Sequence, residues 1–206
     1  MLDTKLKDVK KQGKQNVKHK PTVEREDLGR LKESDVISLT TPQGLLYNVW
    51  FHVMLYFCRR GREGQRNLTR SSFLFLQDEN RKWYATMAHD ESGKTRQGGI
   101  DDTATNYEKL GRMYQTDHRN ALRLYYSKLN PDSNAFFQFP KRFWKGPEES
   151  VWFENRCLGA NKLGSMMKEL SKAANLSQVY TNHCISAVVR CWFVKSPYHV
   201  AVWPQE

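Results

Sequence analysis

The chain has 206 residues, which is enough for one domain with a hydrophobic core and short for two. Hydrophobic residues make up 39% of it and aromatic residues 12%, which excludes a wholly disordered chain. No apolar run is long enough to cross a bilayer, and no apolar stretch follows the lysine-rich N-terminus, so we expect an intracellular protein with no secretory signal and no membrane contact.

The formal net charge of +11 is unevenly distributed. Residues 1–20 hold seven lysines against Asp3 and Asp8, without hydrophobic periodicity, which predicts a basic flexible arm over residues 1–23. A second group of basic residues lies between residues 59 and 70, where Glu63 is the only acidic residue, and we call it the arginine cluster. Its members are Arg59, Arg60, Arg62, Arg66 and Arg70. Because the cluster follows an apolar helix, its charges are held on the domain surface, either as a DNA-binding site for phosphates or as a solubilising surface.

The first half of the chain predicts helices followed by a hairpin. Residues 24–31 read as a short helix, and Thr40-Thr41-Pro42 marks the start of the next, because threonine caps helices and proline suits the first turn. Apolar residues from 45 to about 58 recur at three- and four-residue spacing, so this core helix buries one broad face. Residues 71–77 and 82–88 are β-rich and flank a polar turn, which predicts a hairpin followed by a loop over residues 89–105.

The second half predicts two further helices. Residues 117–129 form a helix that ends at Asn130-Pro131, and residues 135–139 form a short strand that ends at Pro140. A mostly polar insertion, residues 141–150, then precedes an amphipathic helix over residues 161–174. Residues 181–194 are the last apolar segment. The pattern predicts an α+β fold that is mainly α, with a small β-hairpin sheet.

Three blocks of sequence carry a resemblance to a known family. They are LLYNVWFHVMLYFCRRGREGQRNL, LGANKLGSMMKELSKAANLS and YTNHC. They resemble the domain derived from Crypton-type DNA transposons, a domesticated branch of the tyrosine recombinases found in zinc-finger MYM-type and glutamine-rich proteins. The resemblance runs over roughly residues 5–185 and implies a tyrosine-recombinase-like catalytic domain at residues 24–185. It also implies a nuclear protein that cuts DNA through a tyrosine nucleophile and rejoins the strands.

The resemblance implies three catalytic residues. The family arginine opens a glycine-containing turn after the core helix, which fits Arg60, with Arg62 as the competing assignment. The family lysine lies on a loop after the hairpin and protonates the leaving oxygen, which makes Lys94 the candidate. His183 matches the histidine of the family's H-x-x-R motif, at a helix start that Thr181 or Asn182 could cap.

The departures from the family pattern argue against catalysis. The arginine of H-x-x-R is replaced by Ser186, which cannot make a charged bidentate contact with phosphate. Arg190 would stand about 10 Å further along the helix axis, which makes it a poor substitute. Tyr198 is too close to His183 to be the family nucleophile. We therefore expect a domain incomplete at its C-terminus, followed by a divergent tail over residues 186–206.

The sequence thus predicts an inactive, domesticated recombinase-like domain that retains DNA binding or a protein-interaction role, including self-association. The alternative is an active DNA breaking-and-rejoining enzyme with an unrecognised nucleophile, and a third interpretation is a transposon relic without a binding role. The four cysteines have no C-x-x-C pairing, which disfavours disulfides and a compact zinc site, so we expect reduced core thiols, no metal and no cofactor.

Overall fold

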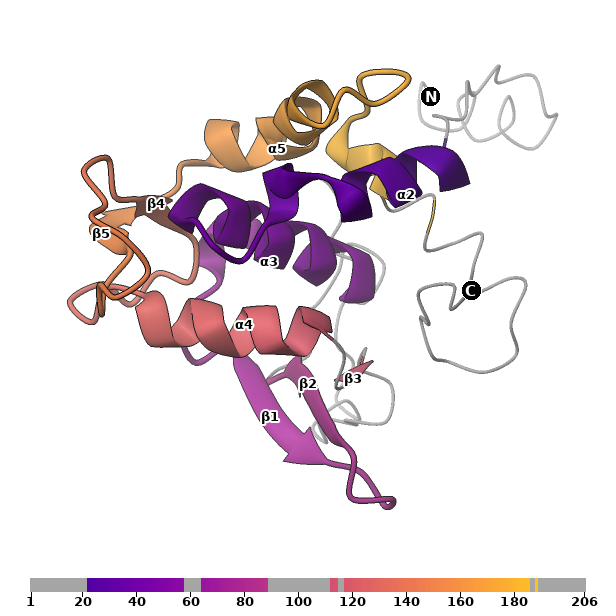
Figure 1. Cartoon of the computed structure of the whole chain (residues 1–206). Coiled ribbons are helices and arrows are strands. Elements are labelled where there is room, and N and C mark those ends of the chain that lie inside the picture. Colours follow the sequence, from indigo (N-terminus) through magenta and orange to yellow (C-terminus); the bar gives the residue numbers. More distant parts are fainter. Residues whose placement is uncertain (1–21, 58–63, 89–111, 115–116, 186–187, 189–206) are drawn as a thin grey trace, which may run out of the picture.

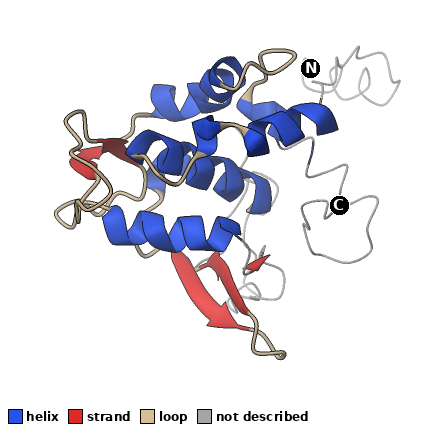
Figure 2. Cartoon of the chain, viewed as in Figure 1, coloured by secondary structure: helices blue, strands red, loops and turns tan. Residues whose placement is uncertain are grey.

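A computed structural model describes residues 22–57, 64–88, 112–114, 117–185 and 188, with the side chains of residues 117–119 left aside. This part of the protein is mixed α/β and mainly helical, with small antiparallel sheets (Figure 2), as the sequence predicts. Helix α3 (Pro42–Tyr56) runs through the middle of the molecule (Figure 1). Helices α2 (Arg25–Glu33) and α5 (Ala160–Ala173) lie on one side of it and α4 (Asp117–Lys128) on the other.

Helix α3 begins as predicted. The Thr41 hydroxyl accepts a hydrogen bond from the Gly44 N–H at 3.1 Å, and Pro42 takes the first helical position. Gly44 is required there, because a Cβ would approach the Ser38 carbonyl oxygen to 2.5 Å. Thirteen of the fifteen helix residues are buried, so the expectation of a single buried face was wrong. The helix is enclosed on all sides.

The predicted hairpin is confirmed. Strand β1 (Phe73–Gln77) pairs antiparallel with β2 (Trp83–Met87), from Phe73 opposite Met87 to Gln77 opposite Trp83. The Asp78 carboxylate accepts from the Asn80 and Lys82 N–H groups, which closes the turn. The hairpin extends past α4 (Figure 1). A third strand, β3 (Met113–Tyr114), pairs with β2 and was not predicted.

The second sheet differs from the prediction. Strand β4 is Gln138–Pro140 rather than residues 135–139, because Ala135 forms only an isolated bridge with Thr69. Its partner β5 (Phe153–Cys157) was not predicted, since only Phe153 of its five residues is buried and its exposed end is polar. Gln138 fixes the approach to β4, with its side chain buried and its amide nitrogen donating to the Ala135 carbonyl at 2.9 Å.

The remaining helices lie close to their expected bounds. Helix α2 runs two residues beyond the predicted end at residue 31, whereas α4 and α5 each end one residue earlier than predicted. Two short 3-10 helices, η1 (Asp35–Ile37) and η2 (Gln65–Asn67), were not predicted. The arm up to residue 21, the loop at residues 89–105 and the tail apart from residue 188 lie outside the described residues.

A buried carboxylate joins α2 to the segment that follows α5. Asp27 on α2 is 1% exposed, and it accepts hydrogen bonds from the Ser177 N–H at 3.0 Å, the Ser177 hydroxyl and the Tyr180 hydroxyl at 2.7 Å. Arg30 lies 3.6 Å from the same carboxylate. Burial raises the pKa of Asp27, but these hydrogen bonds and Arg30 together outweigh it, so the pKa lies below its usual value.

We predict that Asp27→Asn lowers the free energy of unfolding by about 2 kcal/mol at pH 7, because an amide cannot accept all three bonds. The lowered pKa means that the carboxylate stabilises the fold fully above the unfolded-state pKa of about 4 and progressively less as the pH falls through the folded value. Urea unfolding should therefore show a gap in the free energy of unfolding between the parent chain and Asp27→Asn, and this gap should narrow below about pH 4. The exposed Asp35→Asn is the control, and a gap that does not change with pH would contradict the prediction.

Candidate functional site

The helical turn at residues 182–185 carries His183, the imidazole that the family resemblance points to. Asn182, Cys184 and Ile185 are buried, whereas His183 is exposed. The turn lies beside α5 and α2 and is drawn in yellow in Figure 1. The local pattern of burial therefore directs the imidazole to solvent while its neighbours in the turn pack inward.

The side chain of Asn182 fixes this turn to α5. Its Oδ1 accepts from the Met167 N–H at 3.2 Å, and its Nδ2 donates to the Leu163 carbonyl at 2.9 Å. Asn182 thus bonds to two main-chain groups that face each other in an α-helix. Of the two residues expected to cap the turn, Thr181 stands at the position directly before it, whereas the Asn182 amide bonds across to α5. Thr181 holds the turn through its main chain, where its carbonyl accepts from the Cys184 N–H at 2.8 Å.

Tyr180 anchors the other side of the same turn. Its side chain is 1% exposed, and its hydroxyl donates to Asp27 on α2. Its N–H donates to the Ser171 hydroxyl at 3.0 Å, and that hydroxyl donates to the Met167 carbonyl at 2.7 Å. His183 is therefore held at a defined place on the surface by bonds to two helices.

Two members of the arginine cluster lie within the described residues. Arg66 is exposed on η2, next to the buried Gln65, whose side-chain oxygen accepts from the Trp50 indole at 3.0 Å. Arg70 is half-buried, and its guanidinium approaches the Asn130 carbonyl at 3.5 Å, near the C-terminal end of α4. Arg66 is thus presented to solvent, whereas Arg70 faces the protein. Arg59, Arg60 and Arg62 lie outside the described residues, as do Lys94 and Ser186.

Helix α5 supports both segments. It contacts η2, which carries Arg66, and it bonds to the turn that carries His183. An exposed imidazole and an exposed guanidinium can each donate hydrogen bonds to phosphate oxygens. Of the three catalytic residues that the resemblance implies, only His183 lies within the described residues, so the assignment of Arg60 and Lys94 stays a prediction.

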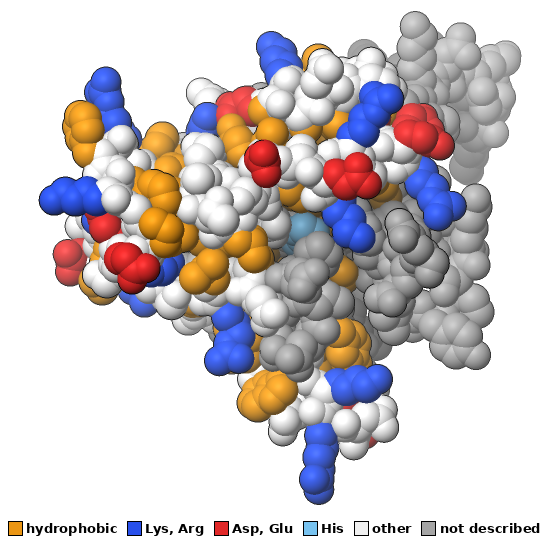
Figure 3. Space-filling view, viewed as in Figure 1, with side chains coloured by type: hydrophobic (Ala, Val, Ile, Leu, Met, Phe, Trp, Pro, Cys, Tyr) orange, Lys and Arg blue, Asp and Glu red, His pale blue; other side chains and the backbone are white. Residues whose placement is uncertain are grey.

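The described residues hold no group of three or more His, Cys, Asp or Glu side chains that could bind a metal ion. Of the described cysteines, Cys184 is buried and free, as expected, whereas Cys157 is free but exposed on β5. None of the described helices is both long and apolar enough to span a bilayer. On the face in Figure 3, lysine and arginine side chains are interspersed with acidic and hydrophobic ones.

Comparison with protein-family models, with curated proteins and with solved structures finds no match to the chain. The assignment to the recombinase-like family therefore stays a prediction from the sequence blocks.

Sequence reasoning missed the bonds that hold His183 in place. Tyr180 and Asn182 belong to the same YTNH run as the histidine, so the run itself marked them, but their partners lie 9 to 19 residues away on α5 and 153 away on α2. Hydrophobic periodicity does not report such contacts, because they join polar groups across elements.

We predict that Asn182→Ala lowers the free energy of unfolding by about 1–3 kcal/mol, because it removes two buried hydrogen bonds and leaves a space beside α5. Asn134→Ala is the matched control, since Asn134 is exposed and the bond it contributes to the described structure comes from its main-chain carbonyl. Urea unfolding of both variants tests the prediction. Equal stability of the two variants would show that the Asn182 amide does not hold the turn.

Proposed function

We propose that the protein is a DNA-holding domain of tyrosine-recombinase ancestry that works in the nucleus and no longer cleaves strands. The observation that carries the proposal is the exposure of His183 on a turn whose neighbouring residues are buried and bonded to α5 and α2. A buried imidazole could not reach a ligand outside the protein. The exposure of His183 supports a contact with a ligand outside the protein.

The arginine cluster supplies the attraction to DNA. Arg66 is exposed next to a residue that is bonded to the core helix, so its guanidinium stands on a fixed base. Such cations bind phosphates without reading the base sequence and release counterions when they do so. The proposed binding is therefore electrostatic and independent of sequence.

The loss of cleavage is proposed from residue 186. In an H-x-x-R motif the two side chains lie three residues apart on one helical face, so both can contact the same phosphate. Serine at position 186 offers one neutral hydrogen bond in place of a guanidinium. Loss of one such stabilising group lowers a rate by about a hundredfold or more, which supports binding without efficient strand cleavage.

We expect duplex DNA binding to weaken steeply with salt, and Arg66→Gln to reduce the slope of log K against log salt by about 1. Replacing all five arginines of the cluster by glutamine should reduce the slope further. Fluorescence anisotropy over a salt series measures both effects. Arg123→Gln on α4, also exposed, is the control and should leave the slope nearly unchanged. Affinity that does not depend on salt would refute the proposal.

We also expect no covalent protein-DNA adduct on a nicked suicide substrate, because the guanidinium partner of His183 is missing. Denaturing electrophoresis of the labelled DNA detects such an adduct. An adduct formed by the purified chain would favour the alternative of an active DNA breaking-and-rejoining enzyme. Loss of that adduct in His183→Ala would then assign the histidine a catalytic role.

A further inference from the structure

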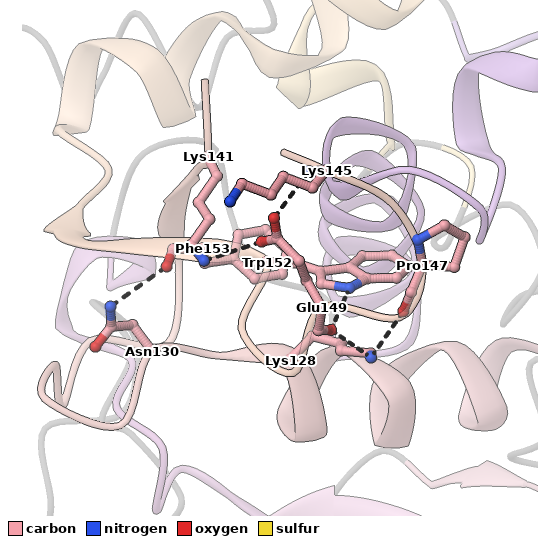
Figure 4. Close-up of polar contacts among 8 residues, drawn as sticks. All are labelled: Lys128, Asn130, Lys141, Lys145, Pro147, Glu149, Trp152 and Phe153. Carbon is pink, nitrogen blue, oxygen red and sulfur yellow. Dashed lines mark hydrogen bonds and ion pairs between the residues drawn. The ribbon is translucent and has the colours of Figure 1, made fainter. Parts of the chain in front are cut away.

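The connection between β4 and β5, residues 141–152, is built around one acidic side chain. Glu149 accepts from the Lys141 ammonium at 3.0 Å and from the Lys145 N–H at 2.8 Å (Figure 4). Hydrogen bonding from Lys141 is the main reason why the pKa of Glu149 lies below its usual value. The Glu149 carboxylate thus accepts its hydrogen bonds from within the connection.

The main chain of the same connection is tied to the body of the domain. The Lys128 ammonium, at the end of α4, donates to the Pro147 carbonyl at 3.2 Å and the Glu149 carbonyl at 2.7 Å (Figure 4). The Trp152 indole donates to the same Glu149 carbonyl at 2.9 Å. These bonds give the polar insertion a defined conformation, so its exposed side chains stand on a preorganised base.

Two adjacent aromatic residues of the connection differ in exposure, because Phe143 points out and Trp144 packs inward. The Trp144 ring meets Trp152 edge to face at 5.2 Å between centroids, with Trp144 half-buried. Phe143 is 83% exposed, the largest exposure among the large hydrophobic side chains of the described residues. The other two exposed large hydrophobic side chains are Trp83 on β2 and Val179 after α5. They belong to other elements, so these three side chains do not form one broad apolar patch.

One cation lies over the exposed ring, and a second follows two residues later in the chain. The guanidinium carbon of Arg142 lies 5.6 Å from the centroid of the Phe143 ring, and both Arg142 and Lys145 are exposed. Among the described residues, no carboxylate lies within ion-pair distance of either cation. The acids of the connection are Glu149, which is occupied, and Glu148. Lys145 is near enough to Glu149 for its charge to help lower the pKa of that carboxyl. An exposed ring with a guanidinium over it and a lysine close by in the chain suits a ligand that has both a flat face and negative charge.

The neighbouring strands repeat this pairing of ring and cation. Arg156 on β5 stacks over Phe139 on β4, with its guanidinium carbon 3.9 Å from the ring centroid. Its guanidinium also pairs with Glu154 at 3.0 Å, and the Arg156 side chain is 62% exposed. The second sheet therefore presents a second partly exposed cation close to an aromatic ring.

We propose that this connection binds single-stranded nucleic acid, with an unpaired base stacked on Phe143 and the adjoining phosphates bonded to Arg142 and Lys145. Every base has a π-face, so such stacking tolerates any sequence, and basic groups beside the ring hold the backbone. A paired base within a duplex cannot present its face to the ring. The surface thus extends the proposed DNA binding to a second kind of ligand, on residues separate from the arginine cluster.

The test measures the affinity of the full chain for a short fluorescent oligothymidylate by anisotropy. Phe143→Ala should weaken binding by about 5- to 150-fold, and Phe143→Trp should retain it, because tryptophan also stacks. Trp83→Ala removes another exposed aromatic ring and should leave the affinity unchanged. Phe143 packs little against the protein, so a thermal melt should show that Phe143→Ala folds like the parent chain. An oligouridylate should lose affinity equally in Phe143→Ala, since the stacking chemistry is the same in RNA.

A duplex arm separates this inference from the proposed function. Phe143→Ala should bind duplex DNA like the parent chain, whereas replacing the arginine cluster should weaken duplex binding. Equal oligothymidylate affinity of the parent and Phe143→Ala overturns the inference, as does a chain that binds no single strand at all. Equal oligothymidylate affinity of the two proteins leaves the proposed duplex binding standing, and loss of duplex binding alone leaves the single-strand surface standing.

Discussion

The enclosure of α3 is the constraint on which the rest of the structure depends. A fifteen-residue helix with almost no exposed side needs neighbours on all sides, and its contacts include η1, α4, α5 and β4. Two buried polar residues within it each bond to a nearby carbonyl, since the Asn48 amide nitrogen donates to the Ile37 carbonyl at 2.9 Å and His52 Nδ1 lies 2.8 Å from the Asn48 carbonyl. Contacts with α3 thereby position the elements around it, and these elements in turn position the residues on their surfaces.

Positions at the surface are set by polar bonds between distant parts of the chain. Asp27 joins α2 to the segment after α5, and Tyr180 links that segment back to α5 through Ser171. Asn182 adds a third link beside His183. Buried polar bonds of this kind fix one arrangement, because a partner left unpaired inside the protein costs more than a surface bond returns. The turn that carries the exposed imidazole is therefore held in place by hydrogen bonds to α2 and α5.

Local signals predicted the elements whose cause is local. Thr41 and Pro42 mark the start of α3, and the Asp78 turn marks the hairpin, because a few adjacent residues create each feature. Strand β5 escaped prediction since its ladder partner β4, and not its own polar sequence, makes it a strand. The bonds of Asn182 to α5 were not predicted for the same reason, because their partners lie on another helix. The candidate site was predictable in its residue types, and its anchoring was not.

The two proposed surfaces differ in what they can recognise. Arg66 stands on a polar 3-10 turn, and none of the three residues of that turn is aromatic, so it offers charge to a phosphate backbone and nothing to a base. The connection after β4 offers fewer cations but adds the exposed Phe143 ring, which rewards only a base that is free of its pairing partner. Charge alone would make the two surfaces compete for the same duplex. The exposed ring makes the two proposed surfaces differ in ligand, because an unpaired base can stack on the ring and a base inside a duplex cannot.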